Sequence, residues 1–88
     1  MSEMKIFAIR DTKADAFNTP FYMSTVGQAL RAFGDEVNNP NSALSKHPED
    51  YFLYELGIYE DATAAFNLLP APRSLSSAVD FFSAPKAA

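Results

Sequence analysis

The chain has 88 residues and a formal net charge of −4, with 11 acidic and 7 basic side chains. This length predicts a single domain, residues 1–88, whose small core buries only about 60 to 65% of the unfolded surface. The acidic balance disfavours a generic polyanion binder. Because the sequence has no cysteine, disulfides, thiolate metal sites and thiol catalysis are excluded.

No apolar run is long enough to cross a bilayer, and the N-terminal residues lack the apolar core of a signal peptide. We therefore expect the protein to stay in the cytoplasm of the cell that makes it. Residues 1–3 and 84–88 are expected to be frayed ends.

The first predicted element is a strand over residues 4–9, a nearly continuous apolar run typical of a central strand that is covered on both faces. Residues 11–19 are polar and show no sustained period. Pro20 then imposes an extended or turn conformation, and residues 21–23 are expected to add a short edge strand.

A helix is predicted from Thr25 to Asn38. Thr25 and Gln28 fit a capping box, and Pro40 cannot continue a helix. The helical spacing makes one apolar stripe of Val26, Ala29, Leu30, Phe33 and Val37.

Gly27 and Gly34 lie seven residues apart on one side of this helix. Each costs about 1 kcal/mol relative to Ala in an exposed helix interior. The pair therefore suggests close approach of another backbone, from the sheet or from a second subunit, although simple tolerance of both glycines stays open. Eight Phe and four Tyr exceed what one small core needs, so we expect a homodimer with these glycines as candidate interface residues.

Two aromatic-rich apolar runs flank a polar tetrad within residues 51–69, the pattern of a β-hairpin. Strict alternation predicts that the even-numbered residues of the first strand form its buried face. In the return strand Ala64, Phe66 and Leu68 would form the matching face. Pro70 and Pro72 are expected to end that strand.

Residues 41–50 are expected to form a loop with one helical turn over residues 42–45. Ser74 can cap a short C-terminal helix whose apolar positions are Leu75, Ala78, Val79 and Phe82. The predicted fold class is α+β: a small antiparallel or mixed sheet of three or four strands, one main helix packed on it and a short C-terminal helix.

His47, the only histidine, is followed by Pro48, Glu49 and Asp50. This cluster could bind a cation or act as an acid/base pair, but ordinary turn chemistry explains it more simply. No glycine-rich phosphate loop is present. We therefore expect no catalytic residue, no metal site, no cofactor and no enzymatic activity.

Single-stranded nucleic acid is bound by basic grooves combined with rings on which bases stack. The chain has such rings, whereas its cations are scattered and only Arg10 and Lys13 form a loose pair. Packing in a core or a dimer interface is the competing interpretation of the rings. The candidate nucleic-acid-binding residues are Arg10, Lys13, Lys46, Tyr51, Tyr59 and Arg73.

Several segments together form a distinctive pattern: residues 4–14, Pro20 with Phe21, residues 29–33 with Asp35, residues 46–51, residues 53–59 and residues 68–70. In combination they resemble the small nonstructural protein of gokushovirus-type microviruses, phages with single-stranded DNA genomes. Members of that family usually begin at the position of Met4, so Met1 to Glu3 precede the usual start.

This resemblance implies a phage protein of the host cell cytoplasm that binds single-stranded DNA or the replication complex, during genome replication or the switch to progeny DNA. It implies no catalytic residue. The alternative is a homo-oligomeric module that acts on a phage or host protein without binding DNA. The expected partners are single-stranded DNA, a phage or host replication protein and a second copy of the chain.

Overall fold

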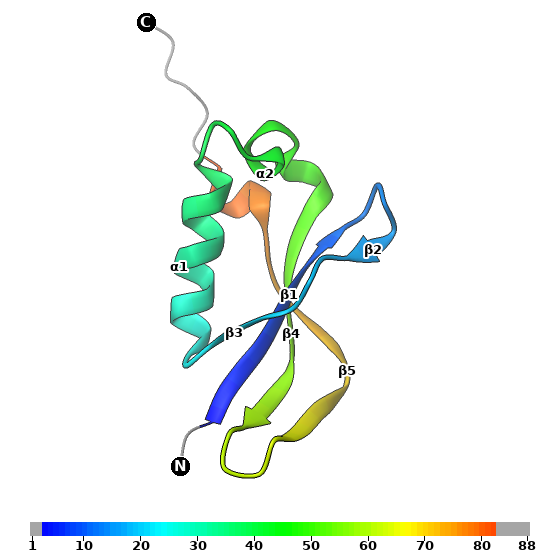
Figure 1. Ribbon diagram of the computed structural model, residues 1–88. Coiled ribbons are helices and arrows are strands. Elements are labelled where there is room, and N and C mark those ends of the chain that lie inside the picture. The colour runs from blue at the N-terminus through cyan, green and yellow to red at the C-terminus, as the bar shows by residue number, and fades with distance from the viewer. Residues whose placement is uncertain (1–2, 83–88) are drawn as a thin grey trace, which may run out of the picture.

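The computed structural model describes residues 3–82, and within them it has an α+β fold in which one main helix packs on a curled antiparallel sheet (Figure 1). The sheet has five strands, one more than the upper number predicted. Its strands are β1 (Glu3–Asp11), β2 (Ala16–Phe17), β3 (Phe21–Met23), β4 (Tyr51–Glu60) and β5 (Ala65–Ser77). The helices are α1 (Val26–Val37), the four-residue α2 (Ala43–Lys46) and the 3-10 turns η1 (Pro48–Asp50) and η2 (Ala78–Asp80).

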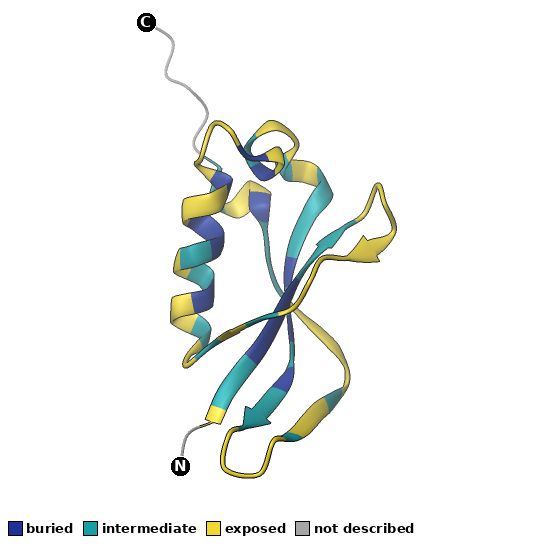
Figure 2. Cartoon of the chain, in the orientation of Figure 1, coloured by how far each residue is buried: buried dark blue, intermediate teal, exposed yellow. Residues whose placement is uncertain are grey.

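β1 is the central strand, as its apolar run predicts. β4 pairs with one edge of β1 and β5 follows β4, while β2 and β3 pair with the other edge. Three consecutive residues, Ile6, Phe7 and Ala8, are buried (Figure 2). Because neighbouring side chains point to opposite faces, this run confirms that β1 is covered on both sides. Glu3, which was expected to fray, already pairs with Glu60.

α1 confirms the capping prediction. The Thr25 hydroxyl accepts a hydrogen bond from the Gln28 backbone N at 3.1 Å, and the Gln28 side chain accepts one from the Ser24 backbone N at 3.1 Å. The helix ends at Asn38, whose backbone N–H donates to the Gly34 carbonyl. Both ends of the helix are therefore set by residues within or beside it.

The core lies between α1 and the face of the sheet that it covers. Phe7 and Leu53 supply the sheet side, and Ala29, Phe33 and Val37 supply the helix side. All five are at most 1% exposed. The predicted helical stripe therefore packs on the sheet as expected, and this packing leaves the opposite face of the sheet free of helices (Figure 1).

The prediction that the even-numbered residues of β4 form its buried face is wrong. Phe7 pairs with Glu55 and Ile6 pairs with Gly57, so Leu56 is an extra residue that has no partner in β1. Such a bulge shifts the alternation by one residue. Leu53, Glu55 and Gly57 are buried, whereas the even-numbered residues 52–58, which were expected to form the buried face, are only half-buried.

The predicted end of the return strand is also wrong, because β5 continues to Ser77. Leu68 pairs with Gly57 and Arg73 pairs with Glu55, so residues 69–72 between them have no partner in β4. Pro70 and Pro72 lie in this unpaired stretch. A proline lacks the N–H that a sheet ladder needs. The strand accommodates both prolines by bulging away from β4.

The C-terminal helix is reduced to the single turn η2. Ser77, not Ser74, caps it: the Ser77 hydroxyl accepts a hydrogen bond from the Val79 backbone N, and Asp80 accepts one from the Ser77 backbone N. Ser74 pairs with Tyr54 inside β5 instead. The predicted turn over residues 42–45 is confirmed with a shift of one residue, as α2 capped by Ser42. Residues 1–2 and 84–88 of the predicted frayed ends lie outside the described residues.

Candidate functional site

The helix-free face of the sheet is crossed by a pair of rings at the β2 end. Tyr54 pairs with Ala8 and Phe17 pairs with Arg10, so both rings stand on this face. β4 and β2 flank β1, yet the two ring centroids are only 5.2 Å apart in an edge-to-face contact. The rings therefore meet over β1, which explains why Ala8 is fully buried without a helix above it.

A cation lies on this ring pair. The guanidinium carbon of Arg10 is 5.4 Å from the centroid of Phe17, within the range of a cation–π contact. The same guanidinium donates a hydrogen bond to the Asp15 carboxylate at 2.6 Å. The Arg10 side chain is 31% exposed and that of Asp15 is 84% exposed, so this ion pair is open to solvent.

The turn between β1 and β2 presents a second cation. The Asp11 carboxylate accepts hydrogen bonds from the backbone N atoms of Lys13 and Ala14 at 3.0 and 3.2 Å. Thr12 donates from its backbone N and its hydroxyl to the Asp50 carbonyl, which ties the turn to η1. Lys13 is exposed. We name Arg10, Lys13, Phe17 and Tyr54 the Arg10 cluster.

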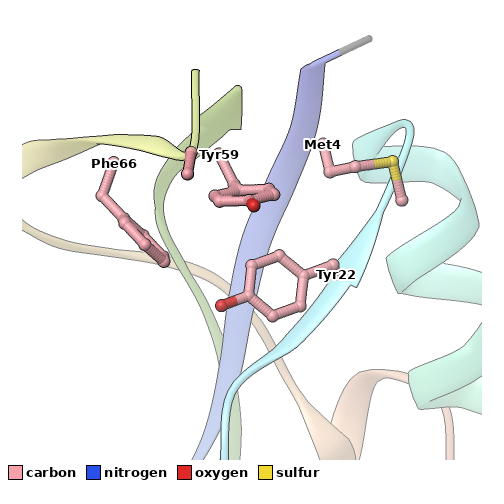
Figure 3. Close-up of a pocket in the computed structure, with 5 residues that line it drawn as sticks. Met4, Tyr22, Tyr59 and Phe66 are labelled. Atoms are coloured by element: carbon pink, nitrogen blue, oxygen red, sulfur yellow. The ribbon is translucent and has the colours of Figure 1, made fainter. Parts of the chain in front are cut away.

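A second group of rings lies at the other end of the same face. Tyr22 pairs with Ile6, and Tyr59 pairs with both Met4 and Phe66. The centroid of Tyr59 is 5.8 Å from that of Tyr22 and 4.9 Å from that of Phe66. Figure 3 shows the Tyr59 ring between the other two, with Met4 beside it.

These residues line an open hollow of about 470 Å³, which we name the Tyr59 hollow: Met4, Tyr22, Tyr59, Ala64 and Phe66. Tyr22 is 41% exposed and Phe66 is 56% exposed. One acidic residue, Asp61, is exposed in the turn that leads to Ala64 in the wall of the hollow, whereas Glu3 and Glu60 alternate with Met4 and Tyr59 and therefore point to the other face. The two ring groups thus share a face but differ in their neighbouring charges.

On the helix-covered side of the sheet, where Glu55 pairs with Phe7, a buried carboxylate holds two cations. Glu55 is 4% exposed, its carboxylate lies 3.7 Å from the Lys5 ammonium, and it accepts a hydrogen bond from Arg73. The Lys5 and Arg73 side chains are 35% and 61% exposed. The Glu55–Arg73 contact holds β5 to β4 directly after the bulge, so Arg73 has a structural partner that the sequence pattern did not reveal.

Tyr51 and Tyr59, predicted on one face, lie on opposite faces because of the Leu56 bulge. Tyr51 pairs with Asp11, on the helix-covered side, and packs against the core. Burial raises the pKa of the Tyr51 phenol, and the Asp11 charge, a hydrogen bond from the phenol to Asp11 and the Asp50 charge raise it further. This tyrosine is half-buried against the core on the helix-covered side, so it does not share a face with the two ring groups.

The remaining predicted site residues are dispersed. Lys46 is exposed at the end of α2, an element that contributes no residue to either ring group. Gly34 is buried, and a Cβ built there would lie 3.1 Å from the Phe81 ring, so Phe81 of the same chain fills that position. Gly27 is exposed, and a Cβ built there would make only an ordinary contact, 3.8 Å from the Thr25 hydroxyl. The two glycines therefore do not form one surface for a second subunit.

The atoms that could bind a metal ion lie within 4.8 Å of one another in His47, Glu49 and Asp50. His47 and Glu49 are exposed. Glu49 and Asp50 belong to η1, and the Asp50 backbone N donates to the His47 carbonyl at 3.0 Å. This is the turn that the residue types predict.

Sequence patterns missed Phe17, Tyr54 and Phe66 as candidate site residues. The alternation in β4 carried a weak signal for Tyr54, but it assigned that ring to the buried face. Among the described residues, no helix is long and apolar enough to cross a membrane.

Comparison with known proteins identifies a family for the chain. The family described as Phage ORF5 protein matches residues 4–81, nearly the whole chain and all of the elements that carry both ring groups. No curated protein and no solved structure gives a match. The chain belongs to the Phage ORF5 protein family.

Proposed function

We propose that this phage protein is a nonstructural protein of gokushovirus-type microviruses and binds single-stranded DNA through the Arg10 cluster. Its role would lie in genome replication or in the switch to progeny DNA, in the host cell cytoplasm. The observation that carries the proposal is the contact of the Arg10 guanidinium with the ring of Phe17. We propose no catalytic role.

Stacking supplies the first part of the binding. Phe17 is 39% exposed and lies edge-on against Tyr54, so its position is fixed before a base arrives. An unpaired base has a π-face that can stack on such a ring, at about 1 to 3 kcal/mol per base. A paired base in a duplex does not expose that face, so we expect a preference for single strands.

Charge supplies the second part. Arg10 contacts the exposed ring and pairs with Asp15, and Lys13 is exposed in the adjoining turn, which also holds the Asp11 carboxylate. A DNA phosphate must therefore compete with Asp15 for Arg10. We expect weak, sequence-tolerant binding whose logarithm falls with the logarithm of salt concentration at a slope of about 1.4, for two phosphates at about 0.7 each.

The direct experiment is a fluorescence-anisotropy titration of a labelled oligothymidine of about 20 nucleotides, over a salt series that starts near 50 mM. Arg10→Gln with Lys13→Gln should weaken binding and bring the salt slope close to zero. Phe17→Leu keeps an apolar side chain but removes the ring, so it should weaken binding while the slope stays the same.

The matched control is Arg31→Gln with Lys46→Gln, which changes the net charge by the same amount on α1 and α2, where both side chains are exposed. This variant should bind nearly as well as the unmodified protein. Equal losses in the two double variants would show that only the overall charge matters. No binding by the unmodified protein near 50 mM salt would overturn the proposal.

A second candidate function is a protein-interaction module that acts on a phage or host replication protein without contacting DNA. The Tyr59 hollow favours it, because its exposed rings suit a protein partner and the nearby Asp61 carboxylate repels phosphates. A complex isolated from infected cells separates the two functions. Association that survives nuclease treatment supports the interaction module, and association that nuclease abolishes supports DNA binding.

A further inference from the structure

Residues 69–72 of β5, with Leu68 before them, form an exposed apolar segment that has left the sheet ladder. Leu68 pairs with Gly57 and Arg73 pairs with Glu55, so the four residues between them have no partner in β4. Leu68 is 65% exposed, and Pro70, Ala71 and Pro72 are exposed. We name residues 68–72 the proline segment.

The backbone of this segment is restricted before any partner binds. Pro70 and Pro72 fix their own φ angles, and each proline also keeps the residue before it extended. Extended proline-containing segments dock in grooves lined by aromatic side chains, since little backbone entropy is lost on binding. The Tyr59 hollow, with Tyr22, Tyr59 and Phe66 in its walls, is such a surface.

Charge complementarity connects the two features. Arg73 directly follows the proline segment, and its side chain remains 61% exposed although it contacts Glu55. The turn that leads to Ala64, in the wall of the hollow, carries the exposed Asp61. A proline segment that enters the hollow of another copy therefore brings Arg73 towards Asp61, an arrangement that favours this chain's own segment over a phosphate-bearing ligand.

The positions of the two features suit a two-fold arrangement. Phe66 pairs with Tyr59, and Leu68, two residues further along β5, pairs with Gly57. Alternate residues of a strand share a face, so the hollow and the beginning of the proline segment lie beside each other on the helix-free face. Two copies that meet through this face can each give a segment and accept one, as a two-fold interface requires.

We propose that the protein forms a two-fold dimer in which the proline segment of each copy occupies the Tyr59 hollow of the other. The dimer covers Phe66 and Leu68, two of the most exposed large apolar side chains among the described residues. The Arg10 cluster lies at the opposite end of β1, so this interface is separate from the DNA site proposed above.

Complementation between two variants tests the reciprocal arrangement. Tyr22→Ser damages the hollow and keeps the segment, whereas Leu68→Ser with Pro70→Ser damages the segment and keeps the hollow. Each variant alone should sediment as a monomer near 100 µM, with an association at least about tenfold weaker than that of the unmodified protein. An equimolar mixture retains one intact docking contact per mixed dimer, so mixing should restore part of the association.

Val79→Ser is the control, because Val79 is 54% exposed but lies in η2. This variant should dimerise like the unmodified protein, and circular dichroism should show that every variant keeps its fold. A monomeric unmodified protein would overturn the proposal, as would a dimer that neither damaged variant weakens. Failure of the mixture to regain any association would also overturn it, and so would an oligothymidine that occupies the hollow in place of a second copy.

Discussion

Gly57 in β4 lies directly against the backbone of Asn67 in β5. A Cβ built on Gly57 would come within 2.4 Å of the Asn67 carbonyl oxygen and within 2.7 Å of the Leu68 Cα, and the glycine has φ +157°. Backbone atoms of a paired strand cannot move away as a flexible side chain can. The close approach of β5 to β4 at this point therefore requires glycine at position 57.

Gly57→Ala should destabilise the fold by about 3 kcal/mol, because the added methyl group must push β5 away from β4. Gly27→Ala is the matched control, since a Cβ at that position in α1 meets only the Thr25 hydroxyl at an ordinary 3.8 Å, and it should stabilise by about 0.5 to 1 kcal/mol. Urea unfolding of both variants measures the two changes. If Gly57→Ala were as stable as the unmodified protein, the close approach would be wrong.

Glu55→Gln should cost about 2 kcal/mol. The substitution keeps the size of the side chain but removes the buried charge that holds Lys5 and Arg73. Asp15→Asn, which breaks an exposed pair, should cost less than about 0.5 kcal/mol. Thermal or urea unfolding of the two variants side by side makes the comparison, and equal costs would contradict a special role for Glu55.

Tyr51 should make the fold sensitive to alkaline pH. Burial and the neighbouring Asp11 and Asp50 raise its pKa above the ordinary value of 10.0, so the folded state holds the phenolic proton more tightly than the unfolded state. The resulting stabilisation is complete below pH 10.0 and is lost as the pH rises from there through the folded-state pKa.

Urea unfolding over that pH range should therefore show the unmodified protein losing stability more steeply than Tyr51→Phe, which has no phenol at this position. The other tyrosines are common to both proteins and cancel in the comparison. Parallel stability curves would mean that the pKa of Tyr51 is the same in the folded and unfolded states.

Asp15→Asn should strengthen DNA binding, because it removes the carboxylate that competes with phosphate for Arg10. Asp15 has φ +56°, a conformation that asparagine also tolerates, so the turn should survive. At low salt we expect about twofold to fivefold tighter binding to oligothymidine, as one exposed ion pair allows. Asp35→Asn, at an exposed position on α1, makes the same charge change elsewhere and should have a smaller effect.

Local patterns are sufficient to predict α1 and β1. The Thr25 cap and the apolar stripe of α1 involve residues that are close in sequence. The continuous apolar run of β1 indicates by itself that both faces of the strand are covered. The end of β5 depends on more than local pattern. Pro70 and Pro72 normally end a strand, but the Glu55–Arg73 contact and the pairing of residues 73–77 with β4 continue it beyond them.

The candidate site was only partly predictable, because pairing between strands that are distant in sequence also determines which residues meet there. Arg10 and Lys13 are close in sequence, so their proximity is visible without a structure. Phe17 joins them through the two-residue β2, whose polar surroundings show no strand period. The bulge at Leu56 is set by pairing with β1, and it reverses which face each later residue of β4 occupies. No alternation rule applied to β4 alone could therefore place Tyr59.

The most direct test of the DNA-binding proposal is amide chemical-shift mapping of the protein with a short oligothymidine near 50 mM salt. We predict that the largest shifts fall on Arg10, Lys13, Phe17 and Tyr54, that they saturate with added DNA, and that added salt reverses them. Shifts confined to Tyr22, Tyr59 and Phe66 would contradict the assignment of DNA to the Arg10 cluster. The absence of any shift would contradict DNA binding by this chain.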